Sequence, residues 1–264
     1  MKTPDLNLVS DIIVAVSEAE VMPRFNHLSV SDVGTKESPE DLVTVADTET
    51  EKKLTARLQE LLPSSAVVGE EAAFRDPSVL DALNGDAPVW IIDPIDGTSN
   101  FAYGRPEIGV VVALVYKGEA VAGWLYHPVK KIMIMGEKGA GVRMRDKTLS
   151  VAKVSDVRAM NGVVGRNVAF RDPAMPKPVY WGSASYGYIL LVTGCVHYSA
   201  YRTGLIKPWD HAAGVMLHAE AGGYSAFLDA EPYTPFMSRK HLISAPNKDA
   251  WEYLAQNMQA ARAA

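Results

Sequence analysis

The sequence predicts a layered fold of the α/β (α+β) class, and three features of its 264 residues support this prediction. First, residues 6–27 and 48–62 carry apolar side chains at helical spacing, which is typical of helices packed on a core. Second, residues 108–135 are rich in apolar and β-branched side chains and are divided by short turns, which predicts a meander of antiparallel strands. Third, strand-like and helix-like segments alternate after residue 160.

The remaining elements follow from local signals along the chain. Residues 29–41 are polar and contain Gly34 and Pro39, so we expect a loop or a loose hairpin there. Three prolines within residues 171–178 predict a variable loop. Further helices are expected at residues 186–193, 207–220 and 249–261. Further strands are expected at residues 65–69, 89–92, 160–165, 196–201, 224–228 and 238–245.

Length and element order bound the domain organisation. A chain of this length can bury a sizeable core, and the sequence contains no internal repeat or coiled-coil pattern. We therefore expect a single domain over residues 1–264, formed by subdomains of about residues 1–150 and 151–264. The first would combine helices with an antiparallel sheet, and the second would alternate helix and strand.

Composition and charge limit the classes of function. The net charge of −5 and the isoelectric point near 5.7 argue against a nucleic-acid-binding surface. The single cysteine, Cys195, rules out an internal disulfide, and its apolar neighbours in the sequence favour a role in core packing. The first residues do not resemble a signal peptide, and no apolar run is long enough to cross a bilayer. We therefore expect a soluble, cytoplasmic protein without membrane partners.

The stretch from Trp90 to Phe101 carries the strongest functional signal. An apolar run that reads as a buried strand leads into Asp93, and Asp96 follows shortly after it. Pro94 lacks a backbone N–H, so the strand is not expected to continue through it. Two carboxylates at such a corner suit a hard cation such as Mg²⁺, which prefers oxygen ligands.

The residues after Asp96 suit the opposite charge. Gly97 allows a tight turn, and Thr98, Ser99 and Asn100 are all able to cap a helix. The N–H groups at the start of a helix can bind an anion. A cation site beside an anion site is what a metal-dependent phosphoryl-transfer enzyme requires. Asp-Pro and Asp-Gly pairs also occur in ordinary turns, so this stretch alone leaves both interpretations open.

Three other segments add acidic residues to the first two. Asp47 lies at the start of a predicted helix, where an acid is also common as a cap or first-turn residue. Glu70 and Glu71 follow a predicted strand, and Asp210 lies at the start of another predicted helix. Because clustered carboxylates repel one another, their convergence would favour a bound cation.

Taken together, four segments resemble the inositol monophosphatase family. They are Asp41-Leu42-Val43-Thr44 through Asp47, Gly69-Glu70-Glu71, Asp93 through Phe101, and Trp209-Asp210-His211-Ala212-Ala213-Gly214. The resemblance covers nearly the whole chain and keeps the order and rough spacing of the segments. It implies a layered α-β-α-β-α sandwich of the inositol monophosphatase and fructose-1,6-bisphosphatase type. It also implies a lithium-sensitive, Mg²⁺-dependent phosphatase that is often a homodimer.

The resemblance further implies a set of metal ligands. Glu70, Asp93 and the backbone carbonyl of Ile95 would hold a first Mg²⁺ ion. Asp93, Asp96 and Asp210 would hold a second ion. Glu70 would also reach a weaker third ion through water. Two Mg²⁺ ions, or three, are therefore implied for each site.

Catalytic and substrate-binding residues are implied in the same way. Thr98 would form a hydrogen bond with Asp47 and, together with Glu70, would orient a metal-bound water molecule without a covalent phospho-enzyme. The main-chain N–H groups after the acidic corner would hold the phosphate. Small polar residues that open a helix, and a lysine at a family position, are further candidates for contact. The candidate substrate contacts are Gly97, Thr98, Asp96, Ser183 and Lys36.

The substrate is less well defined than the site. The resemblance implies a small phosphorylated metabolite, with inositol 1-phosphate as the default. Inositol-directed members commonly carry a glutamate several residues before the Trp-Asp pair, whereas residues 201–208 contain no acid but include Arg202 and Lys207. Either cation would suit a second anionic group, and a solvated surface charge is the alternative. A conventional arginine is also replaced by Val179-Tyr180-Trp181, which would pack in the core or at a dimer interface.

Two kinds of alternative remain open. Within the phosphatase class, the substrate could be histidinol phosphate, a sugar bisphosphate or 3′-phosphoadenosine phosphate. Ser99-Asn100 after the Asp-Gly-Thr motif favours the inositol phosphatase branch over the nucleotide-directed branch. Some members of the family act through protein partners, for example in RNA metabolism. A partner-binding regulatory role is therefore the alternative of another class.

Overall fold

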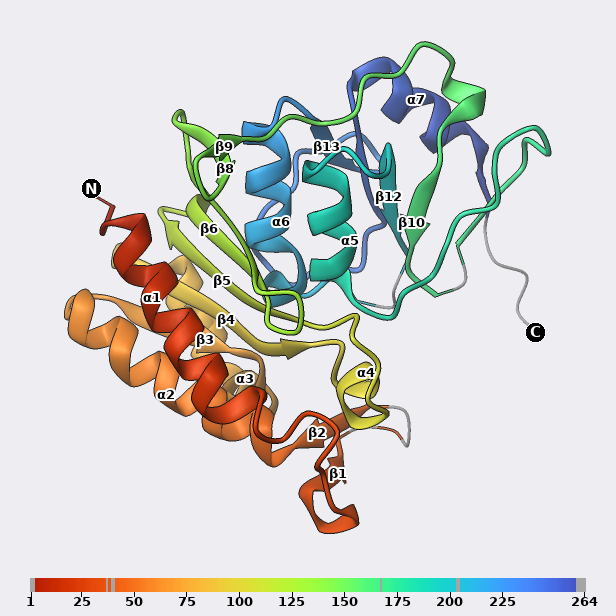
Figure 1. The fold of residues 1–264 in the computed structure, drawn as a ribbon. Helices are drawn as coiled ribbons and strands as arrows, with labels where there is room; N and C mark the ends of the chain where they lie inside the picture. The colour runs from red at the N-terminus through yellow and green to blue at the C-terminus, as the bar shows by residue number, and fades with distance from the viewer. Residues whose placement is uncertain (1–2, 37, 39–40, 167, 203–204, 260–264) are drawn as a thin grey trace.

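A computed structural model describes residues 3–36, 38, 41–166, 168–202 and 205–259, and two sheets form its frame (Figure 1). Seven strands make up the larger sheet. In spatial order they are β3 (Ala66–Gly69), β4 (Val89–Asp96), β5 (Gly109–Tyr116), β6 (Glu119–His127), β7 (Ile132–Glu137), β8 (Gly141–Met144) and β9 (Lys147–Thr148). β3 and β4 are parallel, and the remaining neighbours pair as the antiparallel meander that the sequence predicts.

The second sheet has four strands and comes from the second half of the chain. In spatial order they are β10 (Gly162–Val164), β12 (Tyr198–Tyr201), β14 (Leu242–Ala245) and β13 (Tyr224–Phe227). β10 and β12 are parallel, and the other neighbours are antiparallel. Two short ribbons complete the strands, one from β1 (Val33–Thr35) and β2 (Leu42–Thr44), the other from β11 (Ala169–Phe170) and β15 (Met258–Gln259).

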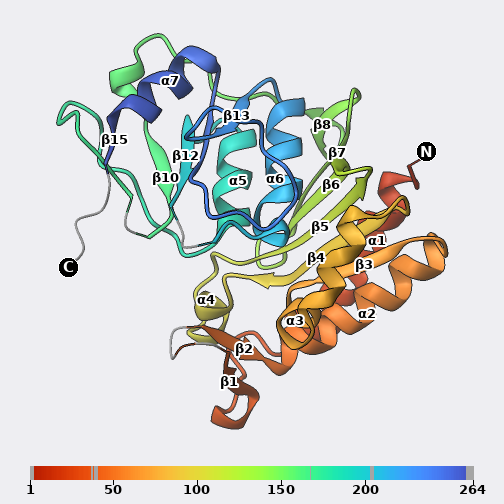
Figure 2. The same ribbon diagram turned by 180° about the vertical axis from the view of Figure 1, so that it is seen from behind.

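The helices form three layers around the two sheets. Helices α1 (Leu6–Val16) and α2 (Val45–Leu61) cover one face of the larger sheet. Helices α5 (Ala184–Val192) and α6 (Pro208–Glu220) lie between the sheets, and α7 (Lys248–Asn257) covers the far side of the second sheet, as Figure 2 shows from behind. Two short helices, α3 (Glu70–Arg75) and α4 (Thr98–Ala102), follow β3 and β4. This α-β-α-β-α order confirms the predicted layered fold.

Burial on both faces explains why the central strands are apolar at nearly every position. Successive side chains of a strand point to opposite faces of its sheet. On β5, Val110 and Val112 join the core beneath α1 and α2, whereas Val111 and Ala113 join the core beneath α5 and α6. None of the helices in the described residues combines the length and the hydropathy that crossing a bilayer demands.

The expectation that Pro94 ends its strand was wrong. β4 continues to Asp96, and its pairing with β5 shifts in register between Asp93 and Asp96. The partners of these two residues are Val111 and Gly109, so three steps along β4 face two steps along β5. This irregularity is a bulge, which accommodates a residue that cannot donate a backbone hydrogen bond.

Three further expectations also need correction. The first helix does not run on to residue 27: α1 passes into a π-helical turn, Ser17–Val21, which ends before Pro23. The last helix ends at Asn257, because the next two residues pair with β11; residues 260–261 lie outside the described part. Cys195 is exposed and does not pack in the core, since it follows the turn that ends α5.

The packing of α2 predicts a large difference between two leucine truncations. Leu54 is fully buried against the larger sheet, whereas Leu8 on α1 is 52% exposed. We expect Leu54→Ala to lower the free energy of unfolding by about 2–5 kcal/mol, because it leaves a cavity. Leu8→Ala, the matched control, should change it by less than about 0.5 kcal/mol. Urea unfolding followed by circular dichroism measures both, and equal losses would contradict the assigned packing.

Candidate metal centre and active site

Three carboxylates converge where the end of β4 meets the first turn of α6. Asp93, Asp96 and Asp210 each offer one oxygen, and these oxygens lie within 4.8 Å of one another. Asp93 and Asp96 are buried, with 1% and 8% exposure. Pro208 occupies the start of α6, where its missing N–H is harmless, and this start places Asp210 in the first helical turn.

The protein's own hydrogen bonds and charges only partly compensate the three acids. Asp93 Oδ1 is buried and has no hydrogen-bond partner among the described residues. Burial raises the pKa of Asp93 well above its ordinary value, and the charges of Glu70 and Asp96 raise it further. Burial also raises the pKa of Asp210 to about 8, although Lys207 opposes the shift. A divalent cation would satisfy the free oxygen and offset the repulsion, so this donor set fits a hard metal ion.

Asp96 is fixed by the start of α5. One of its oxygens accepts hydrogen bonds from Ser183 Oγ at 2.6 Å and from the backbone N–H of Ser185 at 2.6 Å. The other accepts the N–H of Ala184 at 3.1 Å. Burial raises the pKa of Asp96, and these hydrogen bonds lower it in part. Ser183 therefore joins the second half of the chain to the acidic corner, and its hydroxyl is used within the protein.

A buried lysine bridges the two glutamates after β3. Lys36 Nζ lies 2.9 Å from Glu70 Oε1 and 2.6 Å from Glu71 Oε1. The lysine side chain is only 3% exposed. Burial alone would lower the pKa of Lys36, but the charges of Glu70 and Glu71 outweigh it and raise the pKa. The lysine expected near the site is thus in contact with a candidate metal ligand.

Thr98 and Asp47 form the hydrogen-bonded pair that the resemblance implies. Thr98 Oγ1 lies 3.1 Å from Asp47 Oδ1 and 3.0 Å from the carbonyl oxygen of Ile95. The other oxygen of Asp47 accepts hydrogen bonds from the N–H and hydroxyl of Thr44, which caps α2. Burial raises the pKa of Asp47 to about 7. Asp47 is thus a first-turn residue of α2, as the sequence predicts, and the same carboxylate also holds Thr98.

Sequence reasoning missed Glu51, which lies one turn after Asp47 on α2. Its two oxygens accept the backbone N–H groups of Glu71 at 2.7 Å and Ala72 at 2.9 Å, so it caps α3 from a neighbouring helix. Gly69 makes this approach possible, since a Cβ there would lie 2.3 Å from the Glu51 carboxyl carbon. The sequence did contain a signal for Glu51, because it lies four residues after Asp47 and both acids fall on a helix face that must pack.

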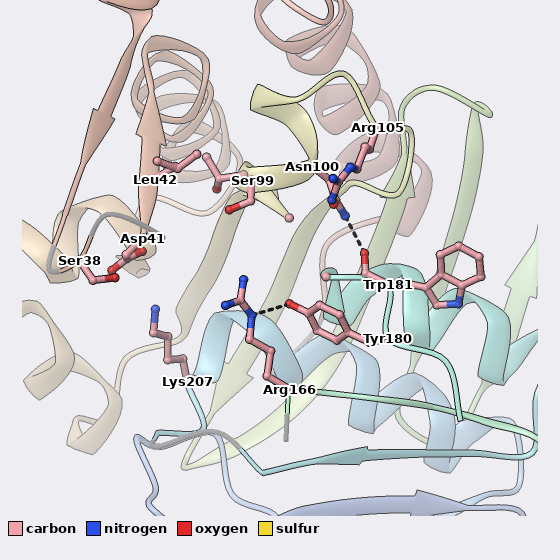
Figure 3. Close-up of a pocket in the computed structure, with 13 residues that line it drawn as sticks. Ser38, Asp41, Leu42, Ser99, Asn100, Arg105, Arg166, Tyr180, Trp181 and Lys207 are labelled. Carbon is pink, nitrogen blue, oxygen red and sulfur yellow. Dashed lines mark hydrogen bonds between the residues drawn. The ribbon is translucent and has the colours of Figure 1, made fainter. Parts of the chain in front are cut away.

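Gly97 makes the turn between β4 and α4. Its φ is +89°, a left-handed conformation that favours glycine, and it serves as the N-cap of α4. The cap is therefore not one of the three polar residues expected to provide it. Asn100 instead joins the loop to neighbouring segments, because its amide donates to the carbonyl of Glu107 at 2.7 Å. The same amide donates to the carbonyl of Trp181 at 2.8 Å (Figure 3).

An open pocket of about 520 Å³ lies beside this turn. Gly97 and Thr98 form part of its wall. Lys207 also lines it and lies across the opening from Ser99 (Figure 3). Lys207 Nζ is also 3.8 Å from Glu70 Oε1, so this lysine faces the site. Arg202 is not among the described residues that line this pocket; its charge acts on His241, whose pKa is lowered first by burial and then by Arg202.

The fold and the site define a layered α/β protein with a buried carboxylate centre suited to a divalent cation. The model of the inositol monophosphatase family matches residues 9–263. The chain belongs to the inositol monophosphatase family, whose members hydrolyse phosphate monoesters, and it is a phosphatase of that family.

Individual relatives agree with this assignment. The chain is 32% identical to the inositol-1-monophosphatase of Bacillus subtilis, over 81% of this chain and 83% of the relative. It is 28% identical to Nus factor SuhB of Pseudomonas aeruginosa, over 93% and 92%. A solved Thermotoga maritima IMPase superposes with a TM-score of 0.78 at 24% identity, covering 91% of each chain, which supports the fold.

The buried acids predict that the metal-free protein loses stability as the pH rises. An acid whose pKa is higher in the folded chain than in the unfolded chain contributes stability at low pH, and this contribution is lost as the pH rises toward the folded value. The folded values are about 7 for Asp47 and about 8 for Asp210. In EDTA, we expect the melting temperature to fall by roughly 5–10 °C between about pH 6.5 and about pH 8.

Buried histidines change stability with pH in the opposite direction, but they do so below the range proposed for this measurement. Burial lowers the pKa of His211 and His218 from the ordinary histidine value of 6.5 to about 3. The stability that these neutral histidines contribute is therefore lost only as the pH falls below about 6.5. Saturating Mg²⁺ should raise the melting temperature most at the alkaline end, because bound metal favours ionised ligands. A melting temperature that is flat with pH in EDTA would contradict the electrostatic description.

Proposed function

We propose that this protein is a Mg²⁺-dependent phosphomonoesterase that hydrolyses a small phosphate ester with water as the nucleophile and without a covalent intermediate. The observation that carries the proposal is the buried Oδ1 of Asp93 in the three-acid cluster, which has no hydrogen-bond partner in the part of the chain that the structure describes. Asp93 precedes Gly97, the N-cap of α4, by four residues, and an anion would be favoured at this helix start. A cation site and an anion site are therefore adjacent.

Five groups would hold the metal ions. Glu70, Asp93 and the carbonyl of Ile95 would bind a first Mg²⁺, and Asp96 and Asp210 would join Asp93 around a second. Glu70 would reach a third ion through water. When bound, Mg²⁺ lowers the pKa of water, screens the phosphate charge and stabilises the leaving oxygen.

Thr98 and Asp47 would orient the attacking water. A hydroxyl that donates its proton to Asp47 keeps its lone pairs, so Thr98 Oγ1 can accept a hydrogen bond from water. Glu70 would accept the other proton of the same water molecule. Because Thr44 holds Asp47 and burial excludes solvent from it, the pair is fixed before substrate arrives.

The turn at Gly97 would bind the phosphate. The N–H groups of Gly97 and Thr98 would donate to phosphate oxygens as charge develops on them. Asp96 orders this corner through Ser183, and Lys36 adds a positive charge close to Glu70. These contacts orient the ester. The buried carboxylates would repel its phosphate until a bound cation offsets their charge.

The substrate class and the assembly extend the proposal. Inositol 1-phosphate is the default substrate, and histidinol phosphate, a sugar bisphosphate and 3′-phosphoadenosine phosphate are the alternatives.

We propose a cytoplasmic, Li⁺-sensitive homodimer. The large side chains Val179, Tyr180 and Trp181 support an interface, since they are 45%, 49% and 38% exposed on adjoining residues.

A second candidate function comes from the similarity to Nus factor SuhB. A regulatory role through a protein partner in RNA metabolism would not need hydrolysis. The complete set of candidate ligands favours the phosphatase function, because buried carboxylates that repel one another destabilise a fold that does not use them.

Phosphate release from a panel of esters tests the proposed function. The panel contains inositol 1-phosphate, histidinol phosphate, fructose 1,6-bisphosphate and 3′-phosphoadenosine phosphate. We expect release from at least one ester in Mg²⁺ and none above background in EDTA. No Mg²⁺-dependent release from any ester by folded protein would exclude the proposed hydrolysis of this panel and favour the partner role.

A substitution at Asp93 distinguishes a loss of metal-dependent activity from a loss of folding stability. Asp93→Asn should lower kcat by about 100-fold or more, because it removes a ligand shared by two ions. It should also raise the melting temperature in EDTA, because it removes a buried charge with a raised pKa. Asp146→Asn, in the exposed turn between β8 and β9, is the matched control and should change neither. Loss of both activity and fold in Asp93→Asn would contradict this account.

A further inference from the structure

The pocket beside the candidate phosphate site has a strongly cationic wall. Arg105, Arg166 and Lys207 all line it. They come from the segment after α4, the segment after β10 and the residue before α6, and Figure 3 shows them around one opening. Among the described residues that line this pocket, Asp41 is the only acid. The wall therefore carries a net positive charge where the part of an ester beyond its phosphate would lie.

Arg166 is positioned before any ligand binds. Its Nε donates to the hydroxyl of Tyr180 at 3.0 Å, and its guanidinium carbon lies 5.8 Å from the centre of the Tyr180 ring. In Figure 3 the rest of the guanidinium points into the pocket on the side of Lys207. A cation that is already oriented loses less side-chain entropy when it binds an anion.

Arg166 and Tyr180 also connect the pocket to the acidic centre. Both residues line a second hollow of about 250 Å³, whose wall includes Asp96 and Asp210. A small ester with its phosphate at the carboxylate centre would thus have its leaving group beside Arg166. The cationic wall and the acidic centre are within the span of one metabolite-sized molecule.

The other two cations lie on either side of Arg166. Lys207 is 33% exposed, and its Nζ lies 5.6 Å from the centre of the Trp209 ring as well as near Glu70. Arg105 is at the exposed rim, with its guanidinium carbon 5.7 Å from the centre of the Tyr103 ring. Together the three residues offer donors from the interior to the rim of the pocket.

Resting on the phosphatase function proposed above, we propose that the preferred substrates carry a second anionic group on the leaving group, which binds Arg105, Arg166 and Lys207. Phosphate and carboxylate share the required chemistry, because both accept charge-assisted hydrogen bonds from guanidinium and ammonium groups. The neutral polyol of inositol 1-phosphate, the default substrate, offers no charge to balance this wall, so we expect that ester to rank below the doubly anionic alternatives.

Matched pairs of esters test this inference in Mg²⁺. Glycerol 2-phosphate and 2-phosphoglycerate differ by a carboxylate, and fructose 1-phosphate and fructose 1,6-bisphosphate differ by a phosphate. We expect kcat/KM to be about 10-fold or more higher for the doubly anionic member of at least one pair, and the preferred pair identifies the anion. The preference should shrink as the salt concentration rises.

Substitutions in the cationic wall test whether these side chains cause the preference for doubly anionic esters. Arg166→Gln should reduce the ratio of kcat/KM values within the preferred pair by about 10-fold, through a higher KM for the doubly anionic ester. Arg105→Gln at the rim should reduce it less. Arg145→Gln, in the exposed turn between β8 and β9, removes the same charge far from the pocket and should leave the ratio unchanged.

Two different failures are distinguishable. Equal kcat/KM values within both pairs, or a ratio that Arg166→Gln leaves unchanged, would overturn the second-anion inference while Mg²⁺-dependent hydrolysis stands. Hydrolysis of inositol 1-phosphate or histidinol phosphate in Mg²⁺, with none of these four esters hydrolysed, would likewise overturn only the second-anion inference. No Mg²⁺-dependent hydrolysis of these four esters or of the earlier panel would overturn the proposed phosphatase function together with this inference.

Discussion

Repulsion among buried carboxylates is the constraint on which the rest of the site depends. Asp93 and Asp96 are buried and Asp210 is half-buried beside them, so the three carboxylates lie too close together to be ionised at once without a counterion. Asp93 Oδ1 has no hydrogen-bond partner within the described residues, so the hydrogen bonds to Asp96 and the charge of Lys207 relieve this repulsion only in part. A divalent cation would do so, and the energy that a metal ion supplies on binding is then also folding energy.

The fold gathers these acids by directing helix starts toward one point. Asp47 lies in the first turn of α2, Glu70 begins α3, Thr98 begins α4, and Asp210 lies in the first turn of α6, while Asp96 accepts the first N–H groups of α5. The positive end of each helix dipole partly offsets the negative charge. The same starts would also favour the phosphate, so one arrangement serves both the acids and the anionic substrate.

Local chemistry explains what the sequence predicted and what it did not. The acidic corner, the layered order and the Thr98–Asp47 pair were predictable, because short segments and their resemblance carry them. The continuation of β4 through Pro94 was not, since the bulge is defined by its partner strand. Glu51 and Arg166 were missed because their partners, Glu71 and Tyr180, lie 20 and 14 residues away and only the fold brings them together.

Direct titration of the protein with Mg²⁺ by calorimetry, near pH 7 in two buffers of different ionisation enthalpy, tests the central claim most directly. Acids with raised pKa values are partly protonated in the metal-free protein, and they must lose those protons to bind a cation. We therefore expect saturable binding with net proton release, seen as a buffer-dependent enthalpy, and the loss of both in Asp93→Asn. Binding without proton release, or binding that Asp93→Asn leaves intact, would contradict a metal centre built on these carboxylates.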